Sequence, residues 1–219
     1  MKTLLKKASL AIALSLGGLS TQALAVTVSN ISSLAAGGYT GVSVLPAGDL
    51  GFTLDPLFQD TAASIGPFTD SISFTLTASP GEYLASLNLT QTGLNSSGSA
   101  TSAKTAATTT LIVNGISYAA GSVVSLKSDA SAAPFSGPFT LSGSSTPLFT
   151  FAPMTTSANI TVLTTLLATS LGTTTVKESV FVALTGATLD VTTTPVPLPA
   201  SALLLAPALL ALARRRKNA

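Results

Sequence analysis

Strict alternation between small polar and apolar side chains is the feature that most constrains the fold of this chain. Residues 71–78 read Ser-Ile-Ser-Phe-Thr-Leu-Thr-Ala, so every second side chain is apolar. A period of two places these apolar side chains on one face of an extended strand, whereas a helix would need a period near 3.6. The stretch therefore predicts a strand that is buried on one face and exposed on the other.

The same period recurs through the central part of the chain, in runs rich in Thr, Val and Leu. Turn-forming residues separate these runs at short intervals, a spacing typical of antiparallel sandwiches. We therefore predict that residues 26–191 form an all-β body, an antiparallel β-sandwich or jelly roll. The further strand-like runs lie at 83–90, 111–113, 116–118, 159–162, 180–184 and 187–191.

Four turn sequences predict how these runs are connected. Asn114-Gly115 lies between two apolar triplets and predicts a two-residue type I′ hairpin. Ser79-Pro80-Gly81 predicts a second hairpin, between the strands at 71–78 and 83–90. Gly137-Pro138 and Thr185-Gly186 are expected to interrupt later runs.

Two stretches contain few large apolar side chains. Thr92 to Thr110 is mostly Ser, Thr, Ala and Gly, and is expected to form an exposed loop or a long hairpin at a sheet edge. Ser128 to Pro138 is expected to form a similar loop.

Charged residues are scarce and unevenly placed. They make up 8% of the chain, against about 25% in an average domain. Seven of the ten basic residues lie within the first seven or the last six positions, which leaves Lys104, Lys127 and Lys177 against all eight acidic residues. The body is therefore mildly acidic. Nucleic acid is not an expected partner, because phosphate binding needs clustered Lys and Arg.

The N-terminus has the pattern of a secretory signal peptide. Three lysines precede the apolar stretch Ala8 to Leu19, and Ala23-Leu24-Ala25 forms an A-x-A cleavage site. Residues 1–25 are thus predicted to be a signal helix that signal peptidase removes between Ala25 and Val26, after export through the inner membrane. An uncleaved anchor or a buried helix is the alternative, but the apolar run is short for a membrane span.

The C-terminus combines an apolar run with a cluster of cations. Residues 200–213 are mostly Leu and Ala without charge, and predict a single transmembrane helix. The cations that follow in the tail 214–219 are kept in the cytoplasm by the positive-inside rule. A core helix with a basic end is the alternative, although a run that is apolar on all sides has no polar face for water. The cations are Arg214, Arg215, Arg216 and Lys217.

A proline motif precedes this helix, within the segment 192–199. Proline disfavours helix and biases its neighbours towards extended backbone, the form that proteases bind. Residues 192–199 are therefore predicted to be a linker that holds a protease motif clear of the body. The motif consists of Val196, Pro197, Leu198, Pro199 and Ala200.

Together these three C-terminal elements resemble the PEP-CTERM sorting signal in its VPLPA variant. Leu198 stands where the commoner motif has Glu. The resemblance implies that exosortase, an integral-membrane protease, recognises the tail and cleaves near the prolines. It also implies a Gram-negative bacterium, transient membrane anchoring with the body in the periplasm, and delivery to the cell surface or to the extracellular matrix of biofilms, with exopolysaccharide nearby.

A second resemblance lies between Gly66 and Phe74. Phe68 and Asp70 match two positions of the FxDxF group of PEP-CTERM proteins, and Ile72 stands where that motif has its second Phe. The residues by themselves favour a simpler role, in which Asp70 organises a turn while Phe68 and Phe74 fill the core.

The sequence offers little for catalysis or metal binding. The absence of His and Cys excludes a His-based triad, disulfides and thiolate metal sites. A Ser–Lys pair, a carboxylate pair acting on glycosides and a calcium site are formal alternatives without the spacing or aromatic lining they usually need. We predict no enzyme, no cofactor and no metal. The carboxylates considered for calcium are Asp49, Asp55, Asp60 and Asp70.

Polysaccharide binding is the stronger alternative to a purely structural role, because sandwich folds host many such modules. Sugar sites usually stack an aromatic ring, and the chain has three Tyr and no Trp. Tyr83 and Tyr118 lie in strand patterns that predict burial, whereas Tyr39 lies between glycines and is the candidate for an exposed glycan contact. The leading hypothesis is a non-enzymatic exported envelope or matrix protein, and the alternative is a surface-displayed polysaccharide-binding module.

Overall fold

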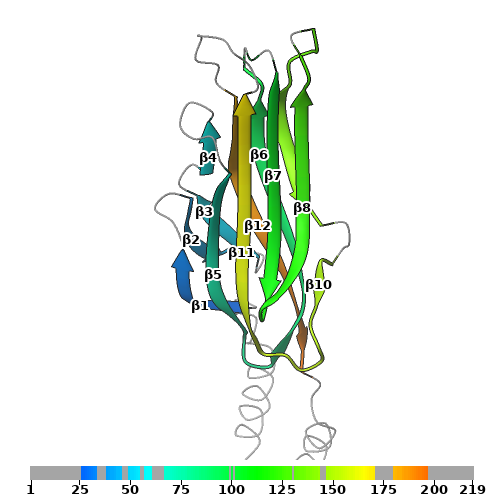
Figure 1. Ribbon diagram of the computed structural model, residues 1–219. Helices are drawn as coiled ribbons and strands as arrows, with labels where there is room; N and C mark the ends of the chain where they lie inside the picture. The colour runs from blue at the N-terminus through cyan, green and yellow to red at the C-terminus, as the bar shows by residue number, and fades with distance from the viewer. Residues whose placement is uncertain are drawn as a thin grey trace, which may run out of the picture.

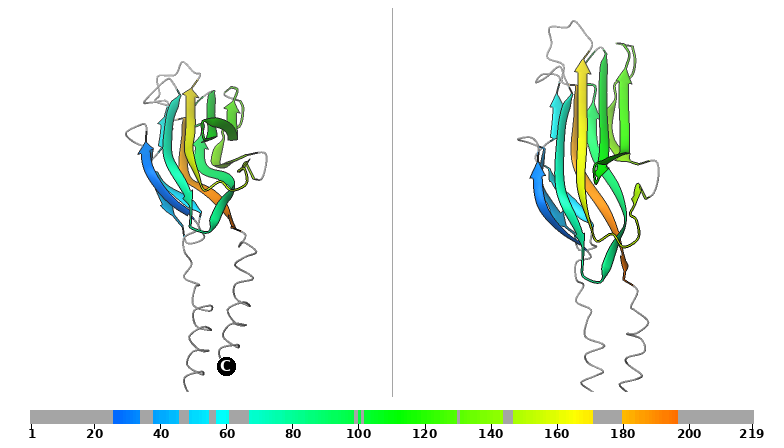
Figure 2. Two further views of the ribbon diagram at one scale, coloured as in Figure 1. Left: turned by 90° about the horizontal axis from the view of Figure 1, so that it is seen from below. Right: turned by 60° about the horizontal axis from the view of Figure 1, so that its bottom comes forward.

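In the computed structural model, the described residues form twelve β-strands in two antiparallel sheets that pack face to face (Figures 1 and 2). The predicted all-β sandwich is confirmed. The predicted signal helix and transmembrane helix lie outside the described residues. Among the residues that are described, no helix is long and apolar enough to cross a membrane. The structure describes residues 26–33, 38–45, 49–54, 57–60, 67–98, 100, 102–129, 131–143, 147–170 and 180–196.

The first sheet contains five strands in the order β1-β5-β11-β7-β8. Buried and more exposed residues alternate along its three central strands, β5, β11 and β7, as a half-buried strand requires. The strands are β1 (Val26–Ser33), β5 (Phe68–Ala78), β7 (Ala103–Val113), β8 (Ile116–Lys127) and β11 (Ser157–Ser170).

The second sheet contains seven strands and is built on β6 and β12, which pair along most of their length. Its main order is β10-β6-β12-β3-β2, with β4 beside β12 and β9 beside β6. The strands are β2 (Tyr39–Val44), β3 (Leu50–Leu54), β4 (Leu57–Asp60), β6 (Glu82–Ser96), β9 (Ser136–Ser142), β10 (Phe149–Thr150) and β12 (Phe181–Pro195).

One of the two predicted hairpins is confirmed and the other is wrong. β7 and β8 are joined by Asn114-Gly115, whose φ angles of 51° and 84° are those that a type I′ turn needs. Ser79-Pro80-Gly81 does reverse the chain, since Glu82 N donates to Ser79 O, but β5 and β6 belong to different sheets. This turn, which we call the arch, therefore crosses from one sheet to the other.

Most of the stretch from Thr92 to Thr110 is strand, and not the predicted exposed loop or sheet-edge hairpin. It supplies the end of β6 and most of β7, which are inner strands of their sheets. Its small side chains leave volume that an aromatic ring fills, because a Cβ added to Gly93 would lie 2.3 Å from the Phe139 ring. Composition alone predicted exposure because it could not show that β9 would supply this ring.

Later interruptions are also absorbed into strands. Gly137 and Pro138 lie within β9, which pairs with β6. Thr185-Gly186 forms a bulge within β12, so the two predicted runs there are one strand. The predicted loop from Ser128 to Pro138 is confirmed only in part, because its described residues 128–129 and 131–135 lie outside the strands whereas residues 136–138 belong to β9.

Both ends of the described body meet at the arch. Val26 pairs with Ala78 immediately before it, and Pro195 pairs with Glu82 immediately after it. Val196 N then donates to Gly81 O at 2.8 Å. The predicted linker at 192–199 is therefore wrong in its first part, because residues 192–195 complete β12. A run of β-favouring threonines with a free partner strand pairs and does not remain a spacer.

The described residues form two hydrophobic clusters in the interior. The proximal core lies towards the arch and is built from large side chains, including Phe74, Leu76, Leu87 and Leu89. The distal core lies towards the opposite end and contains many small ones, including Ala103, Ala107 and Ala168.

Candidate functional site

A layer of polar side chains crosses the interior between the two cores. In the first sheet, Asp70, Thr164 and Thr109 are direct cross-strand neighbours on β5, β11 and β7, so they form a row. Gln91 of β6 and Tyr39 of β2 meet this row from the second sheet. None of these five residues is more than 3% exposed. We call them the polar layer.

Gln91 lies at the centre of the polar layer. Its Nε2 donates to Tyr39 Oη and, at 3.1 Å, to Thr164 Oγ1. Its Oε1 accepts from Thr109 Oγ1. Tyr39 Oη and Thr109 Oγ1 also lie 2.8 Å and 3.2 Å from Thr164 Oγ1, within hydrogen-bond distance. Both ends of the buried amide are thus satisfied by hydroxyl groups, which makes the network specific for this packing of the two sheets.

Tyr39 is buried, and the expectation that it is exposed is wrong. It is 1% exposed, and its ring packs edge-on against Phe52 with centroids 5.7 Å apart. β2 begins at Tyr39, and this first side chain of the strand lies inside the sandwich. The ring is therefore not available at the surface for stacking on a sugar.

Asp70 connects the two sheets. Its Oδ2 accepts a 2.7 Å hydrogen bond from Tyr39 N, while its Oδ1 is buried without a hydrogen-bond partner. The predicted local turn around Asp70 is replaced by this contact with a distant strand. Phe74 fills the proximal core as predicted, and Phe68 is half-buried against the distal core.

The phenol of Tyr39 is held in its neutral form. Burial raises the pKa of Tyr39 to about 12, and the charge of Asp70 acts in the same direction. The hydrogen bonds with Thr164 and Gln91 oppose this shift without cancelling it. At neutral pH the Tyr39 hydroxyl is therefore a hydrogen-bonding group and not a base.

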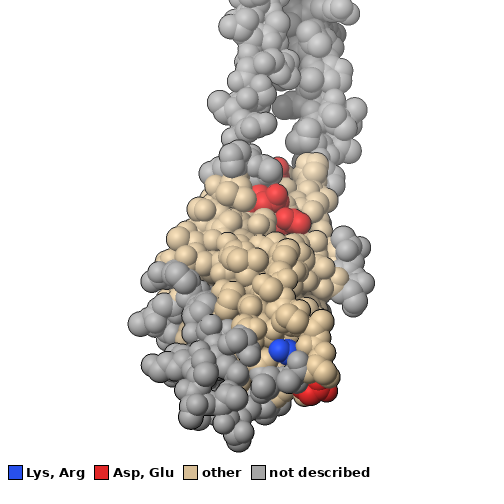
Figure 3. Space-filling model, turned by 90° about the horizontal axis from the view of Figure 1, so that it is seen from above, with Lys and Arg blue, Asp and Glu red and all other residues tan. Residues whose placement is uncertain are grey.

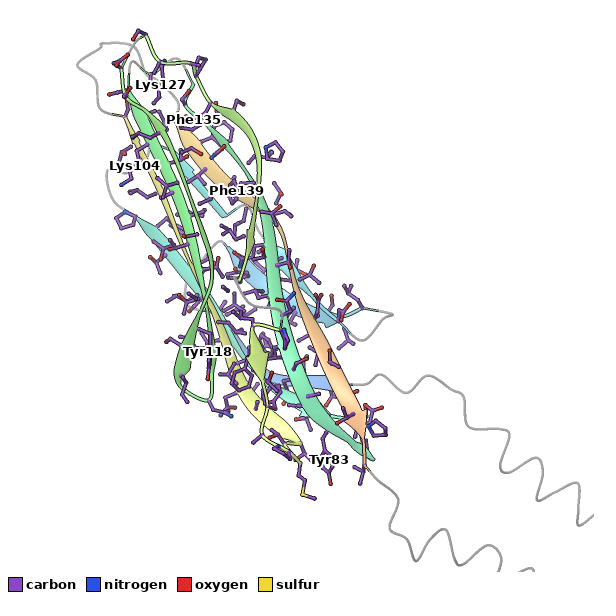
Figure 4. All side chains as sticks on the ribbon, turned by 90° about the vertical axis from the view of Figure 1, so that its right-hand side faces the viewer. Tyr83, Lys104, Tyr118, Lys127, Phe135 and Phe139 are labelled. Atoms are coloured by element: carbon purple, nitrogen blue, oxygen red, sulfur yellow. The ribbon has the colours of Figure 1, made fainter. Side chains whose placement is uncertain are left out.

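A smaller polar group lies in the distal half of the sandwich. Lys127 is 8% exposed, and its Nζ donates to the main-chain oxygen of Ala100 at 2.6 Å. Asn95 Nδ2 donates to Thr105 Oγ1 at 3.3 Å and to Ser125 Oγ at 2.9 Å. Figure 4 shows Lys104 and Lys127 near one end of the sandwich and Tyr83 near the other.

Aromatic side chains gather between β8 and β10. Tyr118 is half-buried against the proximal core and packs edge-on against Phe149, with centroids 4.9 Å apart. Phe149 in turn packs against Phe151 at 4.8 Å. The predicted burial of Tyr118 is therefore only partial, and the same holds for Tyr83.

Charged groups are few on the described surface, and most of the described face in Figure 3 is uncharged (tan), with acidic atoms (red) near both ends and basic atoms (blue) near one. Burial, followed by the charge of Asp49, raises the pKa of Asp190, while a hydrogen bond from Asn88 lowers it. The pKa of Asp129 is lowered, chiefly by hydrogen bonds from Ser131 and Ala132. Within the described ranges, no group of three His, Cys, Asp or Glu side chains could hold a metal ion.

Most residues of the predicted sorting signals lie outside the described part of the chain. This holds for Ala23 and Ala25 of the signal peptide and for the basic cluster, Arg214 to Lys217. Within the proline motif, only Val196 is described.

Comparison with known proteins identifies no family. No protein-family model matches the chain, and no curated protein matches it. Among solved structures, an infectious bursal disease virus chain of the Gt strain has a TM-score of 0.29 and 13% identity, over 72% of this chain and 38% of that one. The chain thus spans well under half of the viral chain.

Two carbohydrate-binding modules are also similar at a low level. TmCBM61, solved with beta-1,4-galactotriose, has a TM-score of 0.21 and 9% identity over 81% of this chain and 92% of its own. A family 11 module from Clostridium thermocellum, solved with a mixed-linked tetrasaccharide, has a TM-score of 0.17 and 11% identity over 78% and 91%. At these TM-scores the similarities carry no argument about function.

Proposed function

We propose that this chain is a non-enzymatic protein of the cell envelope or extracellular matrix, exported by its signal peptide and sorted by a PEP-CTERM-like tail. The observation that supports the proposal most directly is the position of the two ends of the body. β1 begins at Val26, next to the proposed cleavage site, and Val196 opens the proline motif. Both residues lie beside the arch. A signal helix and a tail helix leaving from one pole can cross the same membrane without distorting the sandwich.

The interior agrees with a structural role. The polar layer consists of hydroxyl, amide and carboxylate groups, with no His or Cys to act as base or nucleophile. Its groups are buried from any dissolved substrate. We therefore assign the polar layer to holding the two sheets together, and we assign display or matrix formation to the outer surface.

Mass spectrometry of the surface or released form tests the sorting proposal. The expected product begins at Val26 and ends near the proline motif. A matched strain without an exosortase should retain the tail and keep the protein in the membrane fraction. A surface form that still contains residues 214–219 would contradict the proposal.

Polysaccharide binding is a second candidate, favoured by the outer face of the first sheet. There, β5 and β11 carry a ladder of hydrogen-bonded polar pairs suited to neutral sugar hydroxyls. A pull-down with native exopolysaccharide tests this role, and an absence of saturable binding would remove it. The pairs are Thr69–Thr165 at 3.0 Å, Ser73–Thr161 at 2.7 Å, Thr75–Asn159 at 3.1 Å and Thr77–Ser157 at 3.3 Å.

A further inference from the structure

The polar layer brings a hydroxyl group against an amide carbonyl where water has no access. Thr109 Oγ1 is in direct contact with Gln91 Oε1, and the two residues are 3% and 1% exposed. Thr109 belongs to the first sheet and Gln91 to the second, so the contact spans the sandwich. We propose that Thr109 and Gln91 react to form an intramolecular ester that joins the two sheets covalently.

The reaction needs no external reagent. Thr109 Oγ1 forms a bond to Gln91 Cδ, the bond from Cδ to Nε2 breaks, and the nitrogen leaves as ammonia. The hydroxyl proton of Thr109 ends on the departing nitrogen, so atoms and charge balance. Oxidation states do not change, and the products are one ester and one molecule of ammonia.

Thr164 is placed to carry the proton. Its Oγ1 lies 3.2 Å from Thr109 Oγ1 and accepts a 3.1 Å hydrogen bond from Gln91 Nε2. The three groups form a closed triangle, in which Thr164 can accept the proton from the attacking hydroxyl and pass its own to the leaving nitrogen. Thr164 is thus a positioning and relay residue and not the attacking group.

Two further residues of the polar layer support the geometry. Tyr39 Oη accepts a hydrogen bond from Gln91 Nε2 and limits rotation of the amide. Asp70 is the neighbour of Thr164 in the cross-strand row, and one of its oxygens has no hydrogen-bond partner. Its carboxylate favours the positive character that Thr164 gains as it accepts a proton. Groups held in contact in this way react with effective concentrations far above those in solution.

The linkage would have a clear use in this chain. A chain without Cys cannot form a disulfide, so another covalent bond between the sheets would be the available equivalent. Burial would then protect the ester from hydrolysis for as long as the sandwich remains folded. This inference does not depend on the sorting proposal.

Lys104 allows a direct test, because it lies between Gln91 and Thr109 in the sequence. The full chain is purified from exporting cells, denatured and digested with trypsin. If the ester is present, the fragment ending at Lys104 and the fragment 105–127 migrate together as one species. The mass of that species is lower than the sum of the two fragment masses by one ammonia. Mild alkali should then separate them, with a carboxylate in place of the Gln91 amide. Two separate fragments from the untreated protein would overturn the proposal.

Mass loss alone is not sufficient, because the Asn114-Gly115 turn can also lose ammonia by forming a succinimide. That reaction joins no fragments, so the linked pair is the deciding observation.

Variants identify the residues involved. Thr109→Val should abolish the linked species, Thr109→Ser should retain it, and Thr164→Val should reduce its yield at a given time after synthesis. Thr105→Val is the matched control, because Thr105 is equally buried beside Asn95 and lies on the same tryptic fragment as Thr109. Loss of the link in Thr105→Val, or its retention in Thr109→Val, would overturn the assignment.

Discussion

The proximal and distal cores fill the same sandwich in different ways. In the proximal core, large side chains such as Leu76 and Leu89 from the two sheets occupy the space between them. In the distal core, alanines such as Ala107 leave that space, and Phe139 of β9 fills it from the side. Two sheets can therefore be held together by large residues on the central strands or by small ones with an added strand. The first arrangement should be sensitive to lost volume and the second to added volume.

The largest effect is expected from removing volume in the proximal core. Leu89 is 0% exposed, so Leu89→Ala should reduce the free energy of unfolding by about 2–5 kcal/mol through lost burial and a residual cavity. Urea denaturation measures the change. Leu94→Ala on the same strand is the control, because Leu94 is 44% exposed and should cost far less. Equal losses in the two variants would show that the proximal core is not packed as described.

A stability measurement at alkaline pH tests the polar layer separately from the two cores. The pKa of Tyr39 is raised to about 12 in the folded protein, against 10.0 for an unperturbed Tyr. The contribution of the Tyr39 phenol to the free energy of unfolding is therefore complete below pH 10. It is lost as pH rises towards 12, because the phenol releases its proton at lower pH in the unfolded chain than in the folded protein. The loss should be about 2–3 kcal/mol, from about 1.4 kcal/mol per pKa unit.

Stability measured against pH checks this prediction. In Tyr39→Phe, the free energy of unfolding should fall less at alkaline pH, because the contribution of the Tyr39 phenol is absent. This holds whatever the stability of the variant at neutral pH. Tyr83→Phe is the control for general tyrosine ionisation. An unchanged alkaline profile in Tyr39→Phe would mean that the phenol is not buried in the network.

Adding one methyl group should disturb the distal core. A Cβ on Gly93 would lie 2.3 Å from the Phe139 ring and 2.4 Å from the main-chain oxygen of Ala183. Gly93→Ala should therefore cost about 1–3 kcal/mol by overpacking, measured by thermal or urea unfolding. Gly137→Ala on β9 is matched, since a Cβ there meets nothing within 4 Å. If Gly93→Ala is as stable as Gly137→Ala, Phe139 does not close the distal core.

The smallest effect is expected at Asp190, on the outer side of the strand that lines the proximal core. Its raised pKa means that the folded state disfavours its charge, so Asp190→Asn should be more stable than the parent at neutral pH, by less than about 1 kcal/mol. The difference should disappear as pH falls below the unfolded pKa near 4, because both states are then protonated.

Asp129 provides a control of opposite sign. Its pKa is lowered, so Asp129→Asn should lose stability at neutral pH and match the parent at acid pH. Shifts of the same sign in the two variants would mean that general charge, and not local contacts, controls both.

Several elements of the fold could be predicted from local residues. Alternation predicted β5, β6 and β11, and Asn114-Gly115 predicted a hairpin that is present. The arch could not be predicted in the same way, because Ser79-Pro80-Gly81 specifies a reversal but not the partner of the next strand. β6 pairs with β12, which lies far along the chain, and that choice separates it from β5.

The polar layer was missed because its members are dispersed in sequence. Tyr39, Gln91 and Thr164 each have an unremarkable local context, and Thr and Gln within strands usually indicate an exposed face. A signal was nonetheless available. Asp70, Gln91, Thr109 and Thr164 all occupy positions where the strand alternation calls for an apolar residue, and an interruption of that kind indicates either a bulge or a buried polar contact.

The sequence by itself determined that the body is made of strands and how the charges are distributed. It also suggested signals at both ends that direct the chain to a membrane. These properties depend on neighbouring residues, through backbone preference and side-chain period. Only the tertiary structure decided which strands share a sheet, that β1 begins and β12 ends beside the arch, and that Tyr39 is internal. Those outcomes depend on contacts between residues far apart in the chain, where the packing of two sheets outweighs local preference.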